Sequence, residues 1–189
     1  GIATFTFQVQ DTGGTNNGGS DLDPTPRTAS LNIQPVNDAP SGSDTTVTAT
    51  EDATYTFVTG DFGFTDSLDT PANTLAAVRI ASLPLLGSLT RINTPVTAGQ
   101  LITLADINGG LLRFTPLAGT NATGYANFTF QVQDNGGTDN NGQNLDASPN
   151  TLTIDVTSVN DAPTAAGRTV EMANSAAYTF LTSDFGFAD

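Results

Sequence analysis

Hydrophobic and polar residues alternate along several short stretches of the chain. In residues 128–133 (FTFQVQ) the apolar positions Phe128, Phe130 and Val132 alternate with Thr and Gln. This two-residue period is typical of a β-strand with one buried and one solvated face. Residues 151–156 (TLTIDV) alternate in the same way. We therefore expect a strand at each of these two positions.

Five further runs predict strands, because they are rich in β-branched and apolar residues and are separated by Gly, Pro, Asn and Asp. They cover residues 45–50, 54–59, 75–83, 87–93 and 111–117. Residues 102–107 (ITLADI) fit either an added strand or a single helical turn. Seven strands without a helical period predict an all-β fold, an antiparallel β-sandwich. The Phe residues are expected to form the main mass of its core.

The sequence repeats itself at an offset of 123 residues. VNDAP stands at 36–40 and again at 159–163, and 35 of 66 positions are identical when residues 1–66 are aligned without a gap to residues 124–189. A repeat of this length has the size of a domain, which predicts beads joined at VNDAP within a longer protein. The expected units are the C-terminal part of a preceding repeat (1–40), one complete repeat (41–163) and the N-terminal part of the following repeat (164–189).

The composition restricts both partners and chemistry. Nineteen acidic residues against five Arg, with no Lys or His, give a net charge of −14. Such a surface repels nucleic acid and anionic lipid, so we expect neither as a partner. Without His or Cys there is no Ser–His or Cys–His nucleophile and no histidine or thiolate metal centre. A carboxylate pair is still conceivable, but Glu51 and Asp52 become Asn174 and Ser175 in the next copy, so we expect no enzyme.

The acidic residues gather at one pole of the predicted sandwich. If successive strands alternate in direction, Asp66, Asp69 and Asp134 lie beside the entering linker with Asn37 and Asp38. Like charges at one pole are costly unless a positive group neutralises them, and Arg is scarce. Calcium takes six to eight oxygen ligands from carboxylates, amides and carbonyls, so the pattern predicts Ca²⁺ here. The alternative for the linker is a plain turn in which Asn and Asp cap the backbone.

Two longer motifs resemble a known family. QVQDNGG…TLTIDVTSVNDAP resembles the last two strands and the linker of cadherin-like domains. LITLADINGGLLRFTPLAGTNATGYANFTFQVQDNGG is similar to the proteoglycan-type cadherin-like repeats of large bacterial surface adhesins. The resemblance covers essentially the whole chain. It implies a Greek-key β-sandwich of the cadherin or immunoglobulin-like type and an extended extracellular rod whose junctions bind calcium and serve adhesion.

The resemblance also implies a set of calcium ligands, in the linkers, after the second and sixth strands, and at the end of the first strand. They are Asn37, Asp38, Glu51, Asp52, Asp66, Asp69, Asp134, Asn160, Asp161 and Asp189. The linker departs from that of animal cadherins, which has a further Asp before the Asn and a further Asn after the Asp. Pro35 and Ser158 occupy the first of these places, and Ala39 and Ala162 the second. The junction therefore has fewer ligands.

Two classes of function stay open. The first is a calcium-stiffened stalk or spacer of an extracellular adhesin; its partners are the adjacent repeats, and host or surface glycans or proteins are bound through other domains. Direct homophilic adhesion is not separable from this role by sequence. The second is a carbohydrate-binding module of a secreted protein. Sugar platforms usually need exposed aromatic residues, and the chain has no Trp and only Tyr55, Tyr125 and Tyr178. Two of these side by side on an exposed face would favour the second class.

Overall fold

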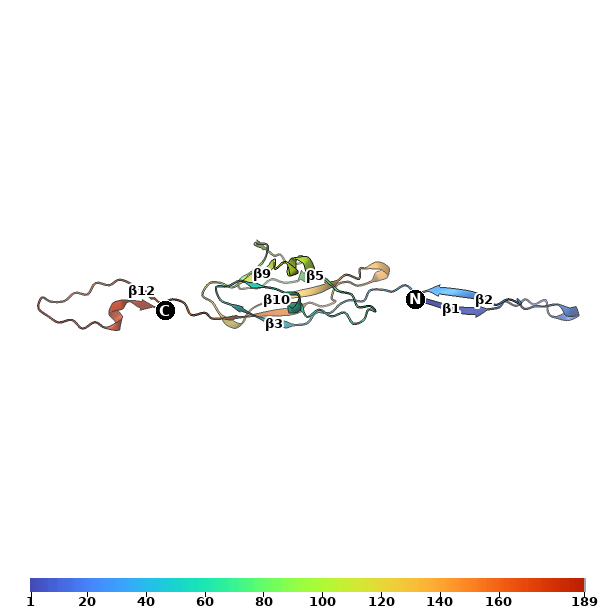
Figure 1. Ribbon diagram of the computed structural model, residues 1–189, viewed down its shortest axis with the longest axis horizontal. Helices are drawn as coiled ribbons and strands as arrows, with labels where there is room; N and C mark the ends of the chain where they lie inside the picture. Colours follow the sequence, from blue (N-terminus) through green and yellow to red (C-terminus); the bar gives the residue numbers. More distant parts are fainter. Residues whose placement is uncertain (189) are drawn as a thin grey trace.

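The computed structural model describes residues 1–188, which consist of strands with very little helix (Figure 1). The all-β prediction is thereby confirmed. The predicted ligand Asp189 lies outside the described residues. A central unit holds the strands β3 (Thr45–Thr50), β4 (Tyr55–Thr56), β5 (Leu75–Ile80), β6 (Ser88–Arg91), β7 (Thr94–Pro95), β8 (Leu101–Thr103), β9 (Leu112–Thr115), β10 (Ala122–Asp134) and β11 (Asn150–Thr157).

These strands form two sheets with the orders β3-β11-β10-β5-β8 and β4-β9-β6-β7. All pairs are antiparallel except one: β3 runs parallel to β11, with Thr45 opposite Leu152. The prediction of a purely antiparallel sandwich is wrong for this pair. The reason is directional, because the first and the last long strand of the unit both start at the pole where the linker enters. Side by side, they must run the same way.

For residues 102–107 (ITLADI) the sequence allowed either a strand or a helical turn, and the structure contains both. Strand β8 pairs with β5, and the helical turn α1 (Leu104–Asn108) follows directly. Thr103 caps the turn: its hydroxyl accepts from Asp106 N at 3.1 Å, while the Asp106 carboxylate accepts from Thr103 N at 3.2 Å. This reciprocal pair satisfies two backbone donors that the start of a helix leaves without partners.

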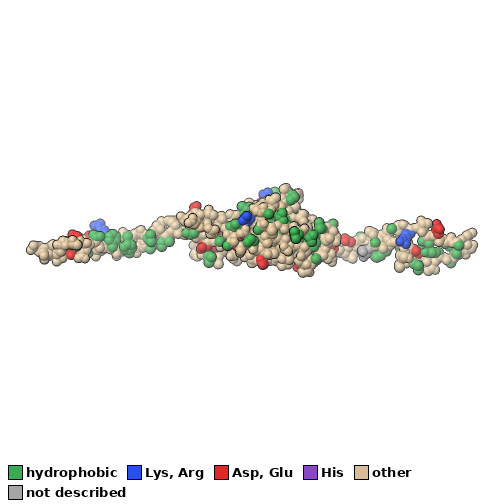
Figure 2. Space-filling view, turned by 180° about the vertical axis from the view of Figure 1, so that it is seen from behind, with side chains coloured by type: hydrophobic (Ala, Val, Ile, Leu, Met, Phe, Trp, Pro, Cys, Tyr) green, Lys and Arg blue, Asp and Glu red, His purple; other side chains and the backbone are tan. Residues whose placement is uncertain are grey.

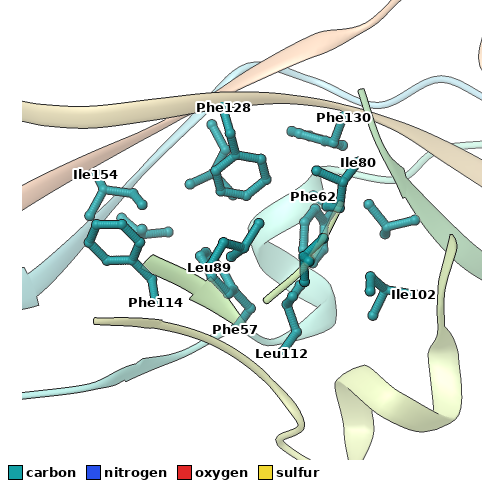
Figure 3. Packing of buried hydrophobic residues seen from close by; sticks show 14 of the residues in the cluster. Phe57, Phe62, Ile80, Leu89, Ile102, Leu112, Phe114, Phe128, Phe130 and Ile154 are labelled. Atoms are coloured by element: carbon teal, nitrogen blue, oxygen red, sulfur yellow. The ribbon is translucent and has the colours of Figure 1, made fainter. Parts of the chain in front are cut away.

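Aromatic rings join the two sheets across the core (Figure 3). Phe57 meets Phe128 edge-on at 5.7 Å between ring centroids, and Phe62 meets Phe130 in the same way at 5.1 Å. All four side chains are fully buried. Edge-to-face contacts of this kind add to the stabilisation from burial alone. The predicted Phe core is confirmed.

The DFGF motif forms a bend that delivers Phe62 into this core. The 3₁₀ turn η2 (Thr59–Phe62) ends at Gly63, whose φ of 52° lies in the left-handed region. A Cβ at Gly63 would also overlap the side chain of Ser43. Phe64, directly after the bend, packs against the core from its edge.

Two flanking segments lie at opposite ends of the central unit (Figure 1). The N-terminal segment is a hairpin of β1 (Ile2–Phe7) and β2 (Arg27–Asn32) with the turn η1 (Asn16–Gly18) at its tip. The C-terminal segment pairs β12 (Thr164–Ala165) with β13 (Phe187–Ala188) and contains the turn η4 (Thr182–Phe185). Within the central unit, the turn η3 (Asp139–Asn141) lies 123 residues after η1. Local geometry thus recurs at the offset of the sequence repeat.

The heptapeptide FTFQVQD occurs in both environments and allows a matched test of the core. Phe128 is fully buried, whereas its counterpart Phe5 is 64% exposed. Phe128→Ala is expected to lower the free energy of unfolding by about 3–5 kcal/mol, because it leaves a cavity between the sheets. Phe5→Ala is expected to change it by less than about 0.5 kcal/mol. Urea denaturation followed by far-ultraviolet circular dichroism measures both; equal losses would contradict this assignment of the core.

The ion pair between β6 and α1 predicts a pH dependence. Arg91 Nη2 donates to Asp106 Oδ1 at 2.7 Å, and this hydrogen bond lowers the pKa of the buried Asp106 carboxyl from 3.8 to about 2. A lowered folded-state pKa means stability that is present above pH 3.8 and is lost as the pH falls towards 2. Asp106→Asn should therefore be less stable than the wild type at neutral pH, with the difference shrinking across this window. Denaturation midpoints at several pH values test this, and a difference independent of pH would contradict it.

Candidate metal site at the linker pole

The linker enters the central unit by placing the Asn37 side chain inside the loop that follows β10. Asn37 Nδ2 lies 2.6 Å from the Gln143 carbonyl oxygen, 3.3 Å from the Gly137 carbonyl oxygen, and 3.2 and 3.3 Å from the two carboxylate oxygens of Asp134. The linker backbone also binds this loop, because Gln143 N donates to the Asn37 carbonyl at 2.8 Å. Asn37 is thus held from both sides by one loop.

Asp134 is the buried centre of this arrangement. Its side chain is only 2% exposed, and Gly136 N donates to Oδ1 at 2.9 Å. A buried carboxylate without compensating partners is strongly unfavourable. In the structure the compensation comes from this backbone amide and from Asn37, which lies 97 residues away in the chain. The linker is therefore part of what makes the buried charge tolerable.

Two further acids reach the same pole through Asn73. Asn73 Nδ2 donates to Asn37 Oδ1 and lies 3.3 Å from Asp69 Oδ2. Asn73 N donates to Asp66 Oδ2 at 2.6 Å, and Asp69 Oδ2 also accepts from Asp38 N at 3.0 Å. One oxygen in this group, Asp66 Oδ1, is buried and has no hydrogen-bond partner.

Gly136 makes the close packing possible. A Cβ at this position would overlap the Asn37 side-chain oxygen and the Asn73 side-chain nitrogen. Only a residue without a side chain lets the loop close over the linker here. Neither Gly136 nor Asn73 was predicted from the sequence to be part of the site. A signal was present for the glycine, because it belongs to the Gly-Gly pair after Asp134 that recurs after Asp11.

The predicted ligands thus fall into three groups. Asn37, Asp66, Asp69 and Asp134 come together at the linker pole, and Asp38 contributes its backbone while its side chain is exposed. Asn160 and Asp161, their counterparts in the second linker, are exposed, and Asn160 Nδ2 donates to the Asp161 carbonyl at 3.0 Å. Glu51 and Asp52 lie at the opposite pole and do not join the cluster.

At that opposite pole, Glu51 has a different role. It is buried, its Oε1 accepts from Val159 N at 2.6 Å, and its Oε2 accepts from Asn121 Nδ2 at 3.0 Å. Asp52 Oδ1 accepts from Gly119 N at 3.0 Å. Both acids therefore bind the protein's own donors, and Glu51 fixes the start of the departing linker.

Around the side-chain nitrogen of Asn37 there are more acceptor oxygens than donor hydrogens. An amide NH₂ has two hydrogens, yet four oxygens surround Asn37 Nδ2. Within residues 1–188, no three acidic side chains converge closely enough to hold a metal ion on their own. A metal here would thus depend on a mixed set. Such a set would combine no more than two of the carboxylates Asp66, Asp69 and Asp134 with the side-chain oxygen of Asn37 and the carbonyls of Gly137 and Gln143.

Comparisons with known proteins add no assignment: no family model, no curated protein and no solved structure matches this chain. In the described part of the chain, every helix is too short and too polar to cross a membrane.

The two copies of VNDAP provide a matched test of the linker contact. Asn37→Ala removes the donor that faces the buried Asp134 and is expected to lower the free energy of unfolding by about 1–3 kcal/mol. Asn160→Ala removes the same group from an exposed position and should change it by less than about 0.5 kcal/mol. Chemical denaturation of both variants makes the comparison. Equal effects would show that the contact with Asp134 does not stabilise the unit.

Proposed function

We propose that this chain is a structural spacer of an extracellular adhesin, built from cadherin-like Greek-key repeats that calcium stiffens at their junctions. The observation that carries the proposal is the insertion of Asn37, from the linker, among the oxygens around the buried Asp134. A linker that served only as a tether between two domains would not have to place a side chain among the buried polar groups of the domain that follows it. The repeat in the sequence and the family resemblance support the same function.

Calcium would be held by the mixed oxygen set at the linker pole. Asp134 and Asp69 would supply charge, and amide and carbonyl oxygens would complete the shell. The ion would neutralise like charges that the protein otherwise compensates with amide donors. The ligands come from the linker and from two separate loops, so binding would restrict the angle between linker and unit. That is the property needed of a stiff stalk.

The tyrosines do not favour the alternative of a carbohydrate-binding module. Tyr55 is half-buried and its hydroxyl donates to Asp61 at 3.2 Å, while Tyr125 is buried and bonds Thr120 at 2.9 Å. Tyr178 lies in the C-terminal segment and bonds Asp184. No two tyrosines among residues 1–188 therefore form an exposed pair of the kind that a sugar platform uses.

Calcium titration tests the proposal. If the dissociation constant lies in the range of extracellular modules, about 0.1–1 mM, then 10 mM calcium should stabilise the fold by about 1.4–2.7 kcal/mol. This corresponds to a rise in melting temperature of roughly 3–10 °C. EDTA should reverse the rise, and small-angle scattering should show a less extended chain in EDTA.

Two variants from the same loop make this test specific. Asp134→Asn should abolish the calcium effect, because it removes the central carboxylate. Asp139→Asn removes an exposed acid of the same loop and should leave the effect intact. A melting temperature and scattering profile that calcium leaves unchanged would overturn the proposal, as would a calcium effect that Asp134→Asn does not reduce.

A further inference from the structure

Asn is followed directly by Gly at three places in the central unit: residues 108–109, 135–136 and 141–142. In an Asn-Gly pair the backbone nitrogen of the Gly can attack the Asn side-chain carbonyl carbon, because the Gly has no side chain to obstruct the approach. The two reacting groups belong to neighbouring residues, so no second molecule has to be brought to the site. The structure holds the three pairs in different ways, and this difference predicts which of them reacts.

Two of the pairs are restrained by their surroundings. The side chain of Asn135 is fixed, because its Oδ1 accepts from Thr74 N at 2.9 Å. It has to break this hydrogen bond before it can turn towards its own backbone. Asn108 is the last residue of α1, and Ile107 beside it is buried in the core. A reaction there would distort a helical turn that is packed against the sheet.

The third pair lies at the tip of the loop that follows β10, in the turn η3 (Asp139–Asn141). No residue of this turn is buried. Among residues 1–188, the Asn141 side chain has no hydrogen-bond partner; only its backbone carbonyl accepts a bond, from Gln143 Nε2 at 3.3 Å. The turn is closed by one bond, from Gly142 N to the Asp139 carbonyl at 3.0 Å. Opening the turn exposes no apolar side chain, so Asn141 reaches a reactive conformation at the lowest cost of the three.

We infer that Asn141 is a site of spontaneous deamidation and isomerisation, and that this reaction loosens the linker. Gly142 N attacks Asn141 Cγ and forms a succinimide ring. The Cγ–Nδ2 bond breaks, and ammonia leaves with the proton that Gly142 N has lost. Water then opens the ring at one of its two carbonyls. One opening gives aspartate, and the other gives isoaspartate, in which the main chain runs through the former side-chain carbons.

Isoaspartate adds one carbon to the main chain directly before the residues that hold the linker. Gly142 is buried against the linker, since a Cβ built on it would lie 3.1 Å from Asn37 Cβ. Gln143 N donates to the Asn37 carbonyl at 2.8 Å, and the Gln143 carbonyl accepts from Asn37 Nδ2 at 2.6 Å. Closely packed contacts of this kind cannot take up an added atom without moving. The lengthened loop therefore loses its hydrogen bonds to the linker.

Both products also add a carboxylate to this loop, whose tip already carries Asp139. The chain has a net charge of −14 and no Lys, and Figure 2 shows only scattered Arg side chains on the face that it presents. The new charge thus meets like charge with little to neutralise it. Only isoaspartate, however, changes the length of the main chain, so the two products should differ in their effect on the linker.

Peptide mapping of the full chain tests where the reaction occurs. The chain is incubated in EDTA at mildly alkaline pH, which favours loss of the amide proton, and is then digested with an acid protease. Fragment masses locate the replacement of NH₂ by OH, and an isoaspartyl methyltransferase labels the isomerised product. Asn141 should react fastest, about fivefold or more ahead of Asn135, which first has to break its bond to Thr74. Asn108 and Asn135 serve as internal references.

Denaturation midpoints in EDTA test the effect on the linker. The isoaspartate form should denature earlier than the untreated chain, with a midpoint shifted towards that of Asn37→Ala. Asn141→Gln should keep its own starting midpoint through the incubation, because its longer side chain closes a ring far more slowly. Asn140→Gln is the matched control in the same turn, with a φ of 56° against 67° at Asn141, and should lose stability like the wild type. Asn141→Asp, which adds only the charge, should lose less than the isoaspartate form.

Several results would overturn the inference. They are a reaction at Asn135 or Asn108 that is as fast as at Asn141, absence of isoaspartate at Asn141, an isoaspartate form as stable as the untreated chain or as Asn141→Asp, and an Asn141→Gln variant that loses stability with the wild type. Because all measurements are made in EDTA, none of these results depends on whether calcium binds at the linker pole.

Discussion

The structure depends first on how the buried Asp134 carboxylate is compensated. Its partners are one amide of its own loop and the side chain of Asn37, which belongs to the linker before the unit. A charge with so little access to water cannot lose such a partner cheaply. The linker is consequently fixed at the pole where it enters, and β3, which follows it, starts from that pole beside β11. The parallel β3–β11 pair and the site at the linker pole are two consequences of the same entry point.

Burial, unlike local geometry, depends on partners that a short sequence motif cannot specify. The Tyr–Asp hydrogen bond of the DFGF turn forms at Tyr55 and Asp61 in the core-bearing unit and again at Tyr178 and Asp184 in an exposed segment. Alternation therefore predicted strands and the inward face of β10 correctly. The same alternation in β1 faces solvent, because no second sheet formed by residues 1–188 covers it. The parallel pairing of β3 with β11 was not predicted, because the alternation of apolar and polar residues does not indicate which strands become neighbours.

The candidate site was predictable to the extent that it follows from strand direction. Counting reversals brought Asp66, Asp69 and Asp134 to the pole of Asn37, where the structure has them. Asn73 and the loop carbonyls were missed, because neutral amides and backbone oxygens carry no charge pattern. The family resemblance implies Glu51 as a ligand, and in the structure its carboxylate accepts from Val159 N, at the pole where the second linker leaves the unit. The residue type alone does not show whether a carboxylate binds a metal ion or accepts hydrogen bonds from backbone amides.

The two poles hold their linkers in different ways, and this difference bears on how successive units are oriented. At entry, Asn37 is held by its amide, and VNDAP supplies the same residue at Asn160. At exit, Val159 is held by Glu51, and the next copy has Asn174 at that position. The residue at the entry pole is thus part of the repeated VNDAP motif, whereas the residue at the exit pole differs between the two copies. Because a carboxylate accepts a backbone N–H more strongly than an amide oxygen does, units that carry Glu at this position should fix their outgoing linker more firmly. Repeats that differ at this position would therefore hold their outgoing linkers with different strength.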